Sequence, residues 1–168
     1  MKTLKKATNS FGLAVLLVVG GMQLSAADSA TEVAAIHAAD DVWVKAFNAG
    51  DVDTMVALYE EHAVLLPPGA PAANGRAAIR ALFAKMAPAA AKDGLEFSLG
   101  AKPAGGARGD FGWSSGTYVL KDKTGHVIET GKYLSVSKKK DGKWLYVRDT
   151  WNSDGPPAST EPGAATKK

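Results

Sequence analysis

The stretch Lys143–Asp154, KWLYVRDTWNSD, carries two of the four tryptophans and predicts the last β-strand of the chain. Side chains alternate between the two faces of a strand. Strict alternation groups Leu145, Val147, Asp149 and Trp151 on one face, and Trp144, Tyr146, Arg148 and Thr150 on the other. Large apolar groups on both faces predict a core or pocket on one side and a second packed surface on the other. Asp149 lies between apolar neighbours, so it is either hydrogen-bonded at a pocket wall or exposed at the strand end.

Three segments upstream of this strand have the apolar spacing of amphipathic helices, namely Thr31–Ala49, Val52–Tyr59 and Arg76–Met86. Gly50 is expected to end the first helix and Asp51 to cap the second. Asp40 interrupts the apolar face of the first helix, four residues after Ile36 and four before Val44. Asp40 is therefore either a pocket carboxylate or a helix-face acid hydrogen-bonded at a strand end.

Strand patterns dominate the second half of the chain. A short strand, Ala63–Leu66, ends at Pro67, and four longer ones follow: Leu95–Ala101, Asp110–Lys121, Val127–Lys138 and Lys143–Asn152. Asp141-Gly142, after three lysines, predicts a solvated hairpin turn before the last of them. Helices first and a meander afterwards predict an α+β fold, with three N-terminal helices packed on one face of a curved antiparallel sheet.

Residues 1–27 have the pattern of a secretory signal peptide. A basic start precedes an apolar run, Phe11–Gly21, and small residues at 25–27 offer a cleavage site before Asp28. A membrane anchor is the alternative, but the run is well short of the roughly 20 residues that span a bilayer. We expect an exported domain at 28–154, followed by a disordered tail at 155–168.

Charge and cysteine content limit which cellular compartment and which binding partners we expect. The chain has 20 basic and 17 acidic residues, and three of the basic ones, Lys2, Lys5 and Lys6, lie in the predicted leader, so the remainder balances. A neutral domain gives no reason to expect nucleic acid or a stable membrane association as a partner. The chain has no cysteine, which excludes disulfides and thiolate metal sites. The bacterial periplasm or medium fits these features.

Four local sequences carry a family resemblance: VWVKAFNAGDVDTMVALYEEHAVLLPPG (42–69), NGRAAIRALF (74–83), GKYLSVSKKKDGKW (131–144) and VRDTWNSD (147–154). With this order of elements, the chain resembles the nuclear transport factor 2-like superfamily, and within it the SnoaL-like domains of unknown function. The resemblance covers about Thr31 to Asp154. It implies a cone-shaped scaffold, which hosts ketosteroid isomerases, cyclases, dehydratases and binding modules.

The catalytic positions of ketosteroid isomerase are not matched. Trp43 stands where that family has a tyrosine donor, Leu66 or Pro67 where it has the aspartate base, and Gly131 or Lys132 where it has a second aspartate. Neither Leu66 nor Pro67 can take a proton, which argues against steroid isomerisation.

Asp149 resembles the general base that SnoaL-like cyclases carry on the last strand. The resemblance implies acid–base chemistry by Asp149, with Asp40 in support. Those cyclases also have a histidine partner for the base. The only histidine of this chain in a comparable stretch is His126, which lies in a predicted turn. The alternative is that both acids are structural and hydrogen-bonded. The three histidines have no metal-site spacing, and we expect no metal and no cofactor.

We expect the odd-numbered residues of the last strand to line a hollow covered by the helices. The predicted ligand contacts are apolar or aromatic: Trp43, Tyr59, Trp113, Tyr133, Val147 and Trp151. Simple core packing is the alternative for these side chains. The opposite, convex sheet face is expected to form a homodimer, as in this superfamily. Two functions remain open: an exported domain that binds a small hydrophobic or amphipathic molecule, or a lyase, isomerase or cyclase that uses Asp149.

Overall fold

A computed structural model of the protein describes residues 26–155. The predicted leader, apart from its last two residues, and the predicted tail from residue 156 lie outside these residues. The helices are α1 (Ala26–Ala49), α2 (Val52–Ala57) and α3 (Gly75–Asp93). The strands are β1 (Tyr59–Leu66), β2 (Ala73–Asn74), β3 (Glu96–Leu99), β4 (Ala104–Arg108), β5 (Phe111–Lys121), β6 (Val127–Lys140) and β7 (Lys143–Ser153).

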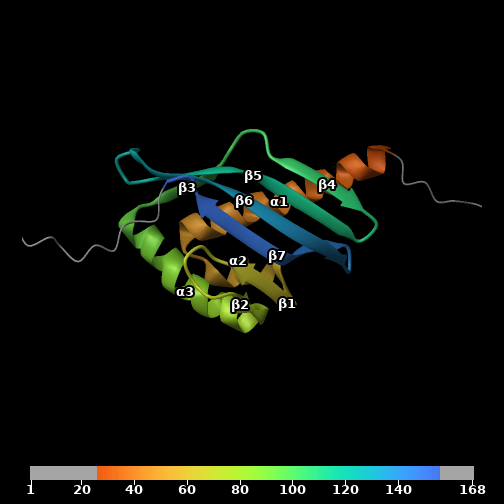
Figure 1. The fold of residues 1–168 in the computed structure, drawn as a ribbon, viewed down its shortest axis with the longest axis horizontal. Helices are drawn as coiled ribbons and strands as arrows, with labels where there is room; N and C mark the ends of the chain where they lie inside the picture. The colour runs from red at the N-terminus through yellow and green to blue at the C-terminus, as the bar shows by residue number, and fades with distance from the viewer. Residues whose placement is uncertain (1–25, 156–168) are drawn as a thin grey trace, which may run out of the picture.

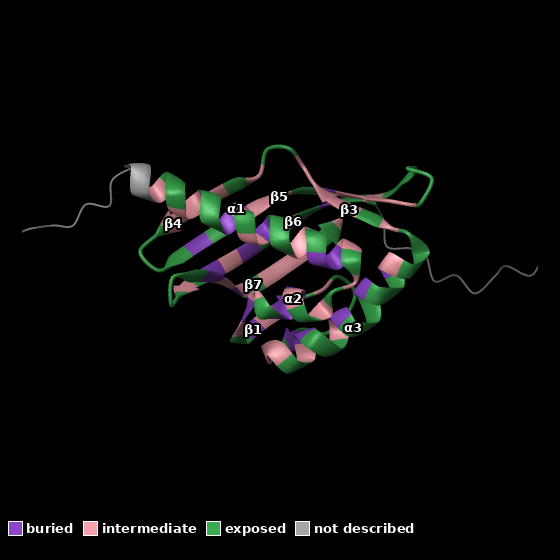
Figure 2. Cartoon of the chain, turned by 180° about the vertical axis from the view of Figure 1, so that it is seen from behind, coloured by how far each residue is buried: buried purple, intermediate pink, exposed green. Residues whose placement is uncertain are grey.

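The strands form a curved sheet in the order β2-β1-β7-β6-β5-β3, with β4 also paired to β5. The three helices lie on one face of this sheet, with α1 crossing the long strands and α2 and α3 packed beside β1 (Figures 1 and 2). The predicted α+β architecture, a curved sheet beneath three helices, is confirmed. The expected all-antiparallel pairing is wrong at one place, because β1 runs parallel to β7. Parallel neighbours require a long connection, and here that connection contains most of the fold.

Local capping explains the break between the first two helices. Gly50 adopts a φ of +67°, a left-handed conformation that suits glycine, directly after the end of α1. The Asp51 side chain then accepts hydrogen bonds from the Thr54 backbone N–H at 3.0 Å and the Thr54 hydroxyl at 2.6 Å. Both predicted roles are confirmed. Among the described residues, no helix is sufficiently long and apolar to span a bilayer.

Helix α3 is longer than its apolar pattern predicts, because it continues through Pro88 to Asp93. A proline inside a helix removes one hydrogen bond. The helix nevertheless buries Ala87 and Ala90, and alanine has the strongest helix preference of all residues. It ends at Gly94, which has a φ of +71°. Burial of this alanine face outweighs the local proline signal.

Strand β4 has no counterpart in the sequence prediction, since its residues AGGAR carry no β-branched or large apolar side chain. It forms because β5 offers a free edge, on which Ala104–Arg108 pairs with Phe111–Ser115. A Cβ atom on Gly105 would lie only 2.9 Å from Nε2 of His37 on α1. The glycine therefore allows the helix and the sheet to approach closely at this point.

A β-bulge in β7 decides which side chains reach the interior. Val136 of β6 pairs with Arg148, but the next residue, Ser137, pairs with Tyr146, so that Val147 is an extra residue without a partner on β6. The alternation is therefore interrupted between Tyr146 and Asp149. The expected separation of these two residues onto opposite faces is wrong, and both face the helices.

The same interruption changes the predicted convex face. Trp144 and Tyr146 are buried, and the Trp144 indole donates a hydrogen bond of 2.8 Å to Glu32 of α1. Neither side chain is therefore on the outer face, contrary to expectation. The outer face of the sheet, defined as the face turned away from the helices, instead carries Phe111, Trp113 and Leu134, all at least 41% exposed.

Candidate functional site

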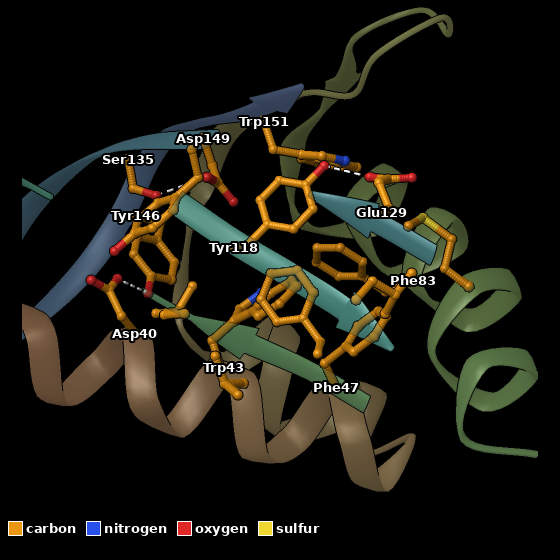
Figure 3. A pocket seen from close by; sticks show the side chains of 16 residues that line it. Asp40, Trp43, Phe47, Phe83, Tyr118, Glu129, Ser135, Tyr146, Asp149 and Trp151 are labelled. Carbon is orange, nitrogen blue, oxygen red and sulfur yellow. Dashed lines mark hydrogen bonds between the residues drawn. The ribbon is translucent and has the colours of Figure 1, made fainter. Parts of the chain in front are cut away.

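A cavity of about 210 Å³ lies between α1, α3 and the inner face of the sheet (Figure 3). Most of its walls are aromatic or aliphatic, and a few polar groups converge on it. Its lining consists of Asp40, Trp43, Val44, Phe47, Phe83, Met86, Phe97, Leu99, Tyr118, Leu120, Glu129, Tyr133, Ser135, Tyr146, Asp149 and Trp151. Mostly apolar walls with a few oriented polar groups are typical of small-molecule sites.

The Asp149 carboxyl is held in the cavity wall by two neutral hydroxyls. Tyr59 donates a hydrogen bond to Oδ2 at 2.5 Å, and Ser135 donates one to Oδ1 at 2.8 Å. Burial raises the pKa of the Asp149 carboxyl, while the two hydrogen bonds act in the opposite direction. Among the described residues no basic side chain pairs with it. The carboxyl is therefore positioned without a counter-charge.

Asp40 forms a second, similar arrangement on α1, where it is only 5% exposed. Its Oδ1 accepts hydrogen bonds from the Tyr146 hydroxyl at 2.6 Å and from the Ser114 hydroxyl at 3.2 Å. Burial raises the pKa of Asp40, and the hydrogen bonds oppose this shift. His37 lies one helical turn earlier, with Nδ1 3.5 Å from Oδ2 of Asp40.

The tyrosines that donate hydrogen bonds to the two acids pack against each other. The rings of Tyr59 and Tyr146, which hold one carboxyl each, pack at a centroid distance of 5.1 Å. The charge of Asp40 further raises the pKa of Asp149, so ionising one acid makes ionising the other harder. Burial and these acids raise the pKa of both tyrosines well above the usual value, so the tyrosines act as hydrogen-bond donors.

Two further hydrogen-bond donors in the cavity wall have no acceptor. The Tyr133 hydroxyl and the Trp43 Nε1 are buried atoms that make no hydrogen bond to any described residue. A buried polar atom without a partner costs free energy, and in a cavity a ligand atom can satisfy it. Tyr133 lies two residues before Ser135 on β6, so its hydroxyl and the Asp149 carboxyl belong to one wall.

Glu129 also lines the cavity, although it was not among the site residues predicted from the sequence. The Tyr118 hydroxyl donates a hydrogen bond of 2.5 Å to Oε1 of Glu129, beside the Trp151 ring (Figure 3). Burial and then this hydrogen bond raise the pKa of Tyr118. A signal for Glu129 was present, because it alternates with Tyr133 and Ser135 on the same strand face.

The predicted site residues separate into two groups. Five of them line the cavity: Asp40, Trp43, Tyr133, Asp149 and Trp151. The other three do not. Tyr59 is fully buried behind Asp149, Trp113 is 41% exposed on the outer face, and Val147 is the extra residue of the bulge. Trp113 is outside because Gly112 and Ser114, its neighbours along β5, face inward.

The structure also places two residues that were compared with catalytic positions of related enzymes, Leu66 and His126. Leu66, at the base position of ketosteroid isomerase, is 45% exposed and is not part of the cavity wall. His126 is exposed in the turn before β6 and does not line the cavity, and the Asp149 carboxyl instead has Tyr59 and Ser135 as its partners. In the described part of the chain, no three potential ligand side chains are grouped to hold a metal ion.

Comparison with solved structures identifies the fold. A nuclear transport factor 2-like protein from Novosphingobium aromaticivorans is 22% identical, with a TM-score of 0.66 over 74% of this chain and 83% of that one. A ketosteroid isomerase-like protein from Erwinia carotovora atroseptica is 22% identical, with a TM-score of 0.58 over 74% and 98%. A protein of unknown function with a cystatin-like fold from Nostoc punctiforme is 15% identical, with a TM-score of 0.65 over 79% and 96%.

At these identities the likeness concerns the fold alone. No functionally curated protein matches the chain. The model of one family, the SnoaL-like domain, matches residues 41–147, which is more than half of the chain and includes most of the residues that form the cavity. This protein therefore belongs to the SnoaL-like domain family and has the nuclear transport factor 2-like fold.

Proposed function

We propose that this domain binds a small, largely apolar molecule in the cavity between α1, α3 and the sheet. The observation that carries the proposal is the cavity itself, whose aromatic walls contain buried polar atoms with no partner, such as the Tyr133 hydroxyl. A cavity of about 210 Å³ is smaller than the roughly 300–1,000 Å³ of pockets for drug-sized ligands. The ligand is accordingly expected to contain one or two rings.

Filling the cavity should abolish binding. Val44→Trp places an indole in the cavity wall without changing an acid, and we expect the affinity for 2-naphthol to fall at least about tenfold, since the ring occupies the ligand volume. Isothermal titration calorimetry measures this. Val42→Trp is the matched control, because Val42 is 41% exposed on the same helix. Equal affinity of the two variants would show that naphthol binds elsewhere.

A second candidate function is acid–base chemistry on the bound molecule, and the environment of Asp149 favours it. Its carboxyl faces the cavity, and burial raises its pKa toward the range useful to a general base. In the proposed step, Asp149 removes a proton from a carbon next to a carbonyl group. The electron pair of the broken C–H bond forms a carbon–carbon double bond, and the π electrons of the carbonyl move to its oxygen, which gives an enolate that the Tyr133 hydroxyl stabilises. Return of the proton to another atom completes an isomerisation, and loss of a neighbouring leaving group completes an elimination.

We also propose that the domain acts outside the cytoplasm. The support is the sequence of residues 1–27, with its basic start, apolar run and small residues before Asp28. Intact-mass analysis of protein recovered from the periplasm or medium should give a chain that begins at or near Asp28. Recovery of the uncleaved chain in the cytoplasm would contradict export.

We further propose that the outer face of the sheet forms a homodimer. Phe111, Trp113 and Leu134 are 51%, 41% and 47% exposed on neighbouring strands of this face, which is an apolar surface suited to burial against a copy of itself. Leu134 lies near the centre, paired across the sheet with Ser115 and Thr150.

Placing a charge on this face should therefore dissociate the dimer. We expect Leu134→Glu to raise the dimer dissociation constant at least about 100-fold, because two carboxylates would be buried without partners. Sedimentation velocity measures the change from dimer to monomer. Val42→Glu, on the helix side, is expected to leave the dimer intact. A wild-type protein that sediments as a monomer at high concentration would contradict the proposal.

A further inference from the structure

Every formally charged side chain in the cavity wall is an acid. Asp40 comes from α1, Glu129 from β6 and Asp149 from β7, and no lysine, arginine or histidine within residues 26–155 lines the cavity. The remaining lining residues are neutral. An anionic ligand would therefore enter a low-dielectric space with like charges and no counter-charge.

The three acids differ in how completely the protein satisfies their oxygens. Each oxygen of Asp149 accepts a hydrogen bond, from Tyr59 and from Ser135. For Asp40, Oδ1 has two donors, whereas Oδ2 is buried without a hydrogen bond, 3.5 Å from Nδ1 of His37.

Glu129 has a donor only at Oε1, the Tyr118 hydroxyl, and its Oε2 is accessible, unlike the buried Oδ2 of Asp40. Among the described residues, Glu129 has no second hydrogen bond and no ion pair. Its Oε2 is therefore available for a positively charged donor. The nearby Asp154 is already paired with Lys132 at 2.7 Å, so it does not compete for that donor.

Two aromatic side chains lie next to this carboxylate. The Tyr118 ring carries the hydroxyl that donates to Glu129, and the Trp151 indole lies beside this hydrogen bond at one end of the cavity (Figure 3). The faces of aromatic rings attract cations, and tryptophan does so most strongly. A carboxylate with an accessible oxygen next to an indole matches an ammonium group, and the apolar walls beyond match a hydrocarbon body.

We propose that the cavity selects small organic cations, in which an ammonium group binds Glu129 beside Trp151 and a ring occupies the apolar interior. The inference rests on the proposed binding function and names its ligand class. It places the charged end at the Glu129 side and the apolar end toward Trp43. Asp149 then remains free for the proton transfer considered above.

Three probes with one skeleton separate charge from apolar burial: phenethylamine, 2-phenylethanol and phenylacetate. They are titrated at pH 7 by calorimetry and by NMR of the tryptophan indole N–H signals, which report on Trp43 and Trp151. We expect phenethylamine to bind at least about tenfold more tightly than 2-phenylethanol, and phenylacetate to bind most weakly. Binding of the alcohol or the acid as tightly as the amine would overturn the proposal and leave the binding function standing. If none of the three bound, the binding function itself would be lost.

The role of Glu129 is tested by Glu129→Gln, which keeps an oxygen to accept the Tyr118 hydrogen bond and removes the charge. The amine should lose at least about tenfold in affinity, while the alcohol changes less than twofold. Glu96→Gln is the matched control, since Glu96 is exposed at the start of β3 and is not part of the cavity wall. Retention of the amine preference in Glu129→Gln would overturn the assignment, even if Asp149→Asn abolished it.

Discussion

Asp149→Asn should lower the turnover of a proton-transfer reaction in this cavity by about 10²–10⁴-fold, the usual contribution of a general acid or base. Asparagine has nearly the same shape and keeps one oxygen to accept from Tyr59 or Ser135, but it cannot take a proton. The Michaelis constant should change little, because the apolar walls remain. Steady-state kinetics on a carbonyl compound that the wild-type protein turns over measures both constants.

The pH profile separates a base from a merely structural acid. Burial raises the pKa of Asp149, so the rate should rise with pH through that raised value as the carboxylate forms. The Tyr59 hydrogen bond lowers this pKa, and Tyr59→Phe should therefore move the rise to higher pH. Asp93→Asn, at the exposed end of α3, is the control and should leave rate and profile unchanged. An unchanged rate in Asp149→Asn would eliminate the proposed base.

The same carboxyl should affect stability with a defined sign. Because its pKa is raised on folding, the folded protein binds more protons than the unfolded chain between the unfolded value, near 3.8, and the raised folded value. The contribution of Asp149 to the free energy of unfolding is thus fully present at pH values below 3.8. It is lost as the pH rises through the pKa of Asp149 in the folded protein, by about 1.4 kcal/mol per unit of pKa difference between the folded and unfolded states. Chemical denaturation between pH 3 and 8 should show a smaller decline in Asp149→Asn.

Phe83→Ala should lower the free energy of unfolding by about 3–5 kcal/mol, the range for removing a buried phenylalanine. Phe83 is 0% exposed on α3, and its ring packs against Trp43 at a centroid distance of 5.8 Å and Tyr59 at 5.7 Å. Alanine removes both ring contacts and enlarges the cavity, since Phe83 also lines it. Urea denaturation measures the loss, and probe binding should weaken with it.

Phe111→Ala provides the matched control for this large effect. Phe111 is 51% exposed on the outer face, with the Lys138 ammonium 5.4 Å from its ring centroid. Its loss should cost at most about 1 kcal/mol, as surface substitutions do. Both variants are compared in the Leu134→Glu background, so that dimer dissociation does not contribute. Similar losses in the two variants would contradict the assigned position of the core.

Local sequence signals determined the order of the elements and several turns. Asp51 caps α2 as predicted, and Asp141 and Gly142 form the β6–β7 turn, with φ values of +50° and +77° that suit an Asp-Gly pair. These features depend on residues a few positions apart, so the sequence contains the information that decides them.

Alternation along β7 predicted Asp149 and Trp151 correctly in the cavity, but for an incomplete reason. The bulge at Val147 brings Tyr146 to the same face, and the position of a bulge depends on pairing with β6, which the β7 sequence alone does not specify. The positions of Tyr146 and Val147 were therefore wrong, whereas residues beyond the bulge kept their predicted face.

Tertiary structure alone decided which polar groups meet. The parallel β1–β7 pairing brings Tyr59 beside Asp149, 90 positions away in the sequence. The folded sheet brings Glu129 and Trp151 to one end of the cavity (Figure 3), whereas alternation along β5 places Trp113 on the outer face. The sequence by itself determined that the chain has a hydrophobic interior containing acids. Long-range strand pairing and sheet curvature determined which hydroxyls hold each acid and which acid keeps an available oxygen, because these contacts depend on residues distant in the chain.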